Sequence, residues 1–113
     1  LPDQPWIGAS WEGFVIEQLL TVAPADVHGH FYKTSGGAEI DLVLSLPGEG
    51  LWAIDIKRSL SPRPERGFHS ACADLAPQRR FLVYPGEESF RLSNETQVIS
   101  LHALASLVAG LAS

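Results

Sequence analysis

The sequence of 113 residues contains no methionine, a single cysteine and no long hydrophobic run. One cysteine excludes an internal disulfide, and this usage fits a reducing, cytoplasmic environment. No apolar stretch approaches the roughly 20 residues needed to cross a bilayer. The N-terminus also lacks the order of a secretion signal, in which basic residues precede an apolar run. We therefore expect a soluble, cytoplasmic protein that does not engage a membrane.

The sequence begins at Leu1 rather than at a methionine, so we expect a piece excised from a longer chain. Residues 1–7 open with Leu-Pro-Asp-Gln-Pro and are interpreted as the remnant of a linker. Residues 8–113 are expected to form a single domain. Their length is near the common size of one domain, and 45% hydrophobic with 19% charged residues is an ordinary globular balance.

Basic residues are scarce: eight Lys and Arg stand against thirteen Asp and Glu, for a net charge of -5. This balance argues against a protein that holds nucleic acid by bulk electrostatics. Six of the eight basic residues nevertheless lie within residues 57–80. The segment predicts either a locally basic side of the domain or a solvated helix with flanking charges, and the sequence leaves both open.

Hydrophobic periodicity predicts three helices. Apolar residues recur at helical spacing from Trp11 to Val22, from Phe68 to Leu75, and from Leu101 to Leu111, with Ser100 as the N-cap of the last helix. Alternating or β-branched runs predict five strands, at His30–Thr34, Ala38–Leu46, Leu51–Arg58, Arg80–Tyr84 and, more weakly, Gln97–Ile99. The order α-β-β-β-α-β-(β)-α predicts an α/β (α+β) fold, in which helices flank a mixed central sheet.

Two aspartates are predicted to face each other across the hairpin of the second and third strands. If this hairpin is symmetric about Gly48, then Asp41 lies opposite Asp55, and Glu39 lies opposite Lys57. Strict alternation also divides each strand into two faces. In the first of these strands, one face is predicted to carry Glu39, Asp41 and Val43, and the other Ile40, Leu42 and Leu44. In the next strand, one face is predicted to carry Ala53, Asp55 and Lys57, and the other Trp52, Ile54 and Ile56.

Opposed carboxylates repel each other unless a cation lies between them. A divalent ion such as Mg²⁺ accepts carboxylate oxygens, polarises a phosphoryl oxygen and lowers the pKa of bound water. The neighbouring Lys57 would stabilise developing negative charge. The pattern thus outlines a site for phosphodiester hydrolysis. An exposed strand face that pairs Glu39 with Lys57 and holds no ion is the alternative.

The first predicted helix carries two acids, Glu12 and Glu17. Glu17 points away from the apolar stripe, whereas Glu12 falls inside it. A carboxylate within a buried stripe is costly unless it is paired, hydrogen-bonded or bound to metal. Glu12 is therefore the better candidate for a third acidic ligand, with a solvated position at the edge of the stripe as the alternative.

Three segments carry a resemblance to a known superfamily: Gly8-Ala9-Ser10-Trp11-Glu12, residues 31–41 (Phe-Tyr-Lys-Thr-Ser-Gly-Gly-Ala-Glu-Ile-Asp), and residues 53–59 (Ala-Ile-Asp-Ile-Lys-Arg-Ser). They resemble the PD-(D/E)XK nucleases, which have the restriction-endonuclease-like fold with an αβββαβ core. More narrowly, they resemble the domain found C-terminal to the ATPase core of many predicted bacterial and archaeal AAA+ ATPases.

The resemblance implies roles for four residues. Asp41 takes the place of the superfamily's first aspartate, Asp55 that of its Asp/Glu, Lys57 that of its lysine, and Glu12 that of the acid on its first helix. All four would be catalytic, and the three acids would bind Mg²⁺ or Mn²⁺. One departure from the pattern is Ile40, where the superfamily's motif has proline.

Two hypotheses of function follow. The first is a metal-dependent nuclease of DNA or RNA that serves an ATPase domain of the same full-length chain. The second is a catalytically inactive module that docks on or regulates that ATPase, since this superfamily includes members that have lost catalysis. The sequence has no G-x-x-x-x-G-K-[ST] loop, so nucleotide hydrolysis by this chain itself is not expected.

Other polar residues give weaker signals. His28 and His30 lie two residues apart and could share a strand face, but they lack a third zinc ligand at suitable spacing and are interpreted as surface residues. Cys72 falls in a helical apolar stripe and is interpreted as structural. Further candidates for contacts near the site are His69, Ser70, Arg58 and Arg66.

Overall fold

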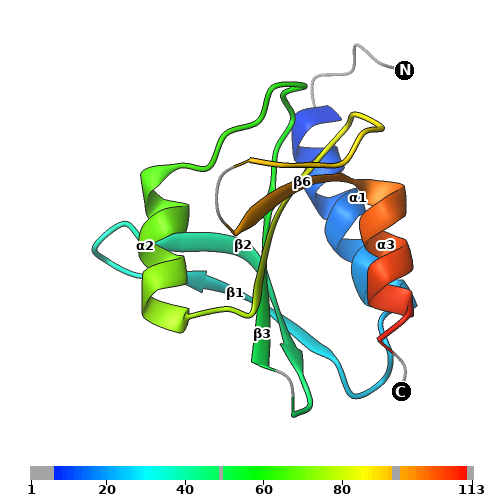
Figure 1. Ribbon diagram of the computed structural model, residues 1–113, viewed down its shortest axis with the longest axis horizontal. Helices are drawn as coiled ribbons and strands as arrows, with labels where there is room; N and C mark the ends of the chain where they lie inside the picture. The colour runs from blue at the N-terminus through cyan, green and yellow to red at the C-terminus, as the bar shows by residue number, and fades with distance from the viewer. Residues whose placement is uncertain (1–6, 49, 93–94, 112–113) are drawn as a thin grey trace.

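A six-stranded mixed sheet with helices on both faces organises the molecule (Figure 1). The computed structural model describes residues 7–48, 50–92 and 95–111, and side chains from Trp11 onward. The elements in chain order are α1 (Ile7–Val22), β1 (His28–Lys33), β2 (Glu39–Leu46), β3 (Gly50–Ile56), α2 (Arg66–Leu75), β4 (Arg79–Tyr84), β5 (Phe90–Arg91), β6 (Thr96–Ser100) and α3 (Leu101–Ala109). The predicted mixed fold, with its order of helices and main strands, is confirmed.

The strands lie in the order β1-β2-β3-β4-β6-β5. The first three form an antiparallel meander, β4 runs parallel to both β3 and β6, and β5 runs antiparallel to β6. Because parallel neighbours need a long crossover, the chain passes through α2 between β3 and β4. Figure 1 shows α2 on one side of the sheet, with α1 and α3 side by side on the other.

Two apolar clusters, one on each face, bury the sheet between the helices. The cluster on the α1 and α3 side includes Val15, Leu19, Leu42, Leu44, Trp52, Ile54, Phe81 and Leu104. The cluster on the α2 side includes Ile40, Val43, Ala53, Phe68, Cys72, Leu82 and Val98. The central strands are therefore covered on both faces, which explains their nearly continuous apolar runs.

Helix α1 packs through a narrower stripe than its periodicity predicts. Val15 and Leu19 are fully buried, but Phe14 is 50% exposed and Val22 is 37% exposed. Both belong to the apolar residues that recur along the predicted helix, but α1 meets the sheet and α3 along one side only. The helix also begins at Ile7, so the last residue of the predicted linker is helical; residues 1–6 lie outside the described part.

The predicted register of the β2–β3 hairpin is confirmed, since Leu42 pairs with Ile54 and Leu46 with Gly50. The predicted faces of β3 are also correct, but those of β2 are not. Ile40 lies in the α2-side cluster, whereas Leu42 lies in the opposite one. The β1–β2 register explains this, because it shifts by one residue within β2 at Asp41 and Leu42, forming a bulge that breaks strict alternation.

The ends of α2 and α3 follow local rules. Ala76 adopts a left-handed conformation (φ 49°) directly before Pro77, and its amide donates to the carbonyl of Cys72 at 2.8 Å. Ser100 caps α3 as predicted, because its Oγ accepts a hydrogen bond from the Ala103 amide at 3.1 Å. Within the described ranges, no helix is long and apolar enough to span a membrane.

Candidate active site

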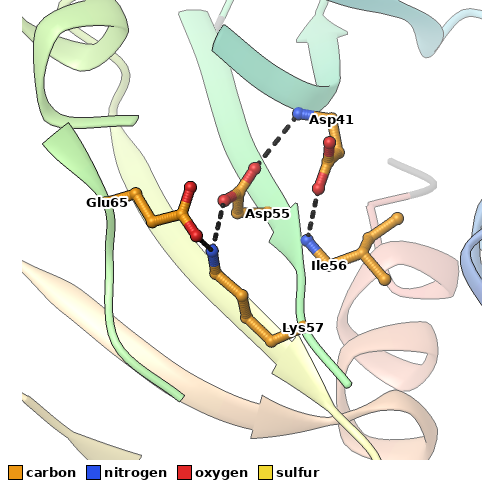
Figure 2. Close-up of polar contacts among 5 residues, drawn as sticks. All are labelled: Asp41, Asp55, Ile56, Lys57 and Glu65. Atoms are coloured by element: carbon orange, nitrogen blue, oxygen red, sulfur yellow. Dashed lines mark hydrogen bonds and ion pairs between the residues drawn. The ribbon is translucent and has the colours of Figure 1, made fainter. Parts of the chain in front are cut away.

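The predicted pair of aspartates lies where β2 and β3 separate (Figure 2). The backbones of these two strands pair from Leu42 and Ile54 to the hairpin turn. Beyond it, the Asp41 amide donates to Oδ1 of Asp55 at 3.2 Å, and the Ile56 amide donates to Oδ2 of Asp41 at 2.8 Å. The two carboxylates thus take over the hydrogen bonds that a continued ladder would have made, and the prediction that they come together is confirmed by this contact.

Asp55 is a buried acid, with 7% of its surface exposed. Its pKa is raised from 3.8 to about 7, first by burial and then by the nearby charge of Asp41, against the opposing effect of Lys57. Both causes of the increase penalise the charged carboxylate. A second cation in the cleft would relieve this penalty.

Lys57 follows β3 and is held in place by β4, because its amide donates to the Val83 carbonyl at 2.8 Å. Its Nζ lies 3.2 Å from Oδ2 of Asp55 and 3.5 Å from Oε2 of Glu65. Figure 2 shows the ammonium between these two carboxylates. The predicted pairing of Lys57 with Glu39 is wrong, because the strands have already diverged at this point.

These groups open into a cleft of about 520 Å³ that also includes Glu12, Glu39 and Arg58. Burial raises the pKa of Glu12, as do the charges of Asp41 and Glu39, while Arg58 lowers it. The structure therefore brings Glu12 to the same cleft as the aspartates. Its side chain is exposed, however, and does not sit within the buried stripe that the sequence predicts.

The walls of the cleft contain residues that the sequence did not single out. Glu65 precedes α2, and Gly67 in the first turn lies against the β1–β2 loop: a Cβ on Gly67 would stand 2.5 Å from the Gly37 carbonyl oxygen. On another wall, the indole Nε1 of Trp11 donates to the Lys57 carbonyl at 2.9 Å. The glycine pair Gly36-Gly37 and the tryptophan on the first helix were the available sequence signals for these contacts.

The donor set suits one kind of metal ion better than others. In the part of the chain that the structure describes, no three His, Cys, Asp or Glu side chains are grouped closely enough to hold a metal ion. Asp41 and Asp55 supply hard oxygen donors from two adjacent strands. Mg²⁺ commonly binds through one or two carboxylates and keeps several waters, so this pair fits such an ion without a third protein ligand.

Of the weaker sequence candidates, Arg58 lines this cleft, whereas the histidines, Ser70 and Arg66 do not. His28 and His30 are exposed on β1, the edge strand of the sheet. His69 and Ser70 are exposed on α2, and neither lines the cleft. Cys72 is fully buried, and burial raises the pKa of its thiol to about 11, which keeps it neutral and agrees with a structural role.

Comparisons with known proteins relate the chain to larger proteins. A family model described as "Domain of unknown function (DUF4143)" matches residues 7–104. The chain is 42% identical over 95 residues to "Uncharacterized protein Rv2008c" of Mycobacterium tuberculosis and to "Uncharacterized protein Mb2031c" of Mycobacterium bovis. Each alignment covers 83% of this chain, which spans about a fifth (21%) of each relative. No solved structure matches the chain significantly.

Proposed function

Since the chain belongs to the DUF4143 family, its chemistry has to be inferred from the cleft, and we propose that the domain hydrolyses phosphodiester bonds of DNA or RNA with a divalent metal ion. The observation that carries this proposal is a pair of aspartates on adjacent strands, each accepting a backbone hydrogen bond from the other's strand, beside a lysine. Asp41 and Asp55 are joined through the backbone, and Lys57 lies 3.2 Å from Asp55. Such a pair is unfavourable for stability and is expected where function requires it.

Each of the four site residues has a defined role in the proposed reaction. Asp41 and Asp55 would hold Mg²⁺ or Mn²⁺, which supplies charge stabilisation at the phosphoryl oxygens and a more acidic bound water. Lys57 would donate to a phosphate oxygen, exchanging its contact with the exposed Glu65 for one with the substrate. Glu12 lies at the cleft's rim, where it would orient water rather than bind the ion directly.

The architecture supports the same proposal. The structure has the chain order α1-β1-β2-β3-α2-β4, and the cleft lies at the ends of β2 and β3. We propose that this is the restriction-endonuclease-like core. Domains of this family often occur with AAA ATPases, and the relatives extend well beyond the matched region. The proposed nuclease would then act beside an ATPase domain of the same longer protein.

Metal binding and cleavage together test the proposal. If Mn²⁺ binds with a Kd of about 0.1 mM, then about 1 mM would stabilise the fold by about 1.4 kcal/mol and raise Tm by roughly 4 to 8 °C. Asp55→Ala should lose both this shift and the cleavage of labelled single-stranded, duplex and branched DNA and of RNA. An equal shift in wild type and in Asp41→Ala would show that the ion binds elsewhere.

A catalytically inactive module is the second candidate. It is favoured by the lack of a grouping of three metal-binding side chains among the described residues. In this case the domain would regulate an ATPase through its surface. Deleting the region equivalent to residues 8–113 from a full-length relative should then change its ATP turnover or oligomeric state, whereas Asp55→Ala should not. An unchanged ATPase rate after the deletion would count against this candidate.

A further inference from the structure

A second groove adjoins the acidic cleft and shares one wall with it. This groove, of about 480 Å³, is lined by Trp11, Tyr84, Pro85, Gly86, Leu101 and His102, together with Glu87 and Ser100. Trp11 also lines the acidic cleft. The groove lies at the C-terminal ends of β4 and β6, where the chain leaves the sheet for the β4–β5 loop and for α3.

The shared tryptophan is held in a fixed orientation. Its Nε1 donates to the Lys57 carbonyl at 2.9 Å, which ties the indole to the residue that carries the ammonium. Its ring also packs at a tilt against Phe14, with ring centroids 6.4 Å apart. Trp11 is only partly buried. A flat aromatic surface therefore borders the groove on one side and the proposed phosphate position on the other.

Tyr84, which also lines the groove, is held by two hydrogen bonds. The Tyr84 hydroxyl donates to the Glu88 carbonyl at 2.9 Å and accepts from the Glu88 amide at 3.2 Å. The Gly86 backbone packs closely against the Tyr84 ring, because a Cβ at Gly86 would stand 2.4 Å from a ring carbon. The groove is thus preformed and contains both apolar surface and polar groups, the Glu87 carboxylate and the His102 imidazole, at its rim.

We propose that this groove receives an unstacked nucleobase, and that the substrate of the acidic cleft is therefore single-stranded nucleic acid. The inference rests on the proposed function, because it is the phosphate in the acidic cleft that would bring the neighbouring base to Trp11. Bases of a single strand stack readily on aromatic side chains without sequence preference. A base within a duplex is already stacked on both faces and would have to be extruded first.

Binding without cleavage tests the inference separately from the reaction. Fluorescence anisotropy with a labelled oligo-dT 12-mer and with a duplex of the same length, both in low salt with Ca²⁺ in place of Mg²⁺ or Mn²⁺ so that the carboxylates still hold a cation, should show at least 10-fold tighter binding of the single strand. Trp11→Leu should weaken binding of the single strand by roughly 5- to 150-fold, the loss expected for one stacked base, and leave duplex binding unchanged. Phe31→Ala, which removes an aromatic ring that is 72% exposed on β1, is the matched control and should have no effect.

A measurement on the wild-type protein covers the case in which Trp11→Leu does not fold. Oligonucleotides containing 5-iodouracil should photocrosslink to peptides containing Trp11 or His102. Equal affinity for single strand and duplex, or crosslinks confined to other surfaces, would overturn the inference. Single-strand binding that depends on Trp11, without any cleavage, would support the inference and contradict the nuclease proposal. Cleavage of duplex that Trp11→Leu does not affect would support the nuclease proposal and overturn the inference.

Discussion

Asp41 and Asp55 are linked by the backbone of each other's strand: the Asp41 amide donates to the Asp55 carboxylate, and the Asp41 carboxylate accepts from the amide of Ile56, next to Asp55. This arrangement gives the Asp41 and Ile56 amides acceptors where the β2–β3 ladder ends. It also holds two like charges together in a partly buried place. The stability of the domain should therefore depend on the protonation of this pair.

The first prediction concerns pH. The pKa of Asp55 is raised to about 7 in the folded state from 3.8, so the folded protein binds this proton more tightly than the unfolded chain does. The contribution of Asp55 to stability is therefore complete below about pH 4 and is lost as pH rises toward 7. Urea unfolding of the metal-free protein from about pH 4 to about pH 8 should show this decline. Asp55→Asn should flatten it, and an equal decline in this variant would assign the effect to other groups.

The second prediction separates the two roles of Asp41. At about pH 5, where Asp55 is mostly protonated, Asp41→Ala should destabilise the fold by about 1 to 3 kcal/mol, because the Ile56 amide loses its acceptor. Asp41→Asn keeps an acceptor oxygen and should cost less than about 1 kcal/mol. It should also lower the pKa of Asp55, since the repelling charge is gone. Urea unfolding and NMR titration of the Asp55 carboxyl would measure the two effects.

Local rules account for much of this site. The turn at Gly48 and the apolar alternation of β3 fix the register that brings Asp41 and Asp55 together, and both are visible in the sequence. The bulge in β2 is not, because it arises from pairing with β1 on the other edge. It moves Ile40 to the α2 face, where Val43 also lies, although simple alternation places these two residues on opposite faces.

Contacts that depend on the path of a loop could not be predicted from the sequence pattern. The loop between β3 and α2 brings Glu65, at its end, to Lys57, at its start. The short strand β5 (Phe90–Arg91) has two residues, too few to show an alternating pattern, and exists through its pairing with β6. The exposed position of Glu12 likewise depends on how α1 is rotated against the sheet, which helical periodicity alone does not determine.

The third prediction compares two helical glycines. Gly67→Ala should destabilise the domain by about 1 to 3 kcal/mol, because its Cβ would stand 2.5 Å from the Gly37 carbonyl oxygen and would force α2 away from the β1–β2 loop. At Gly13 in α1, a Cβ would meet no heavy atom within 4 Å, so Gly13→Ala should stabilise by about 0.5 to 1 kcal/mol. Thermal or urea unfolding distinguishes the two, and a similar effect of both substitutions would contradict the close packing of α2 at this point.

The last prediction concerns Lys57. An exposed pair with Glu39 would contribute only about 0 to 1 kcal/mol, but the observed partner is the buried Asp55, and the side chains of the pair are 15% and 9% exposed. Lys57→Met removes the cation and keeps the apolar stem, so at about pH 8 it should leave the Asp55 charge without its partner and cost about 2 to 4 kcal/mol. At about pH 5 the carboxyl is mostly neutral, and the cost should fall below about 1 kcal/mol. Lys33→Met, at an exposed lysine of β1, is the control and should be neutral at both pH values. Urea unfolding at the two pH values measures this difference, and an equal loss at both would mean that Lys57 supports the fold through packing rather than through the charge of Asp55.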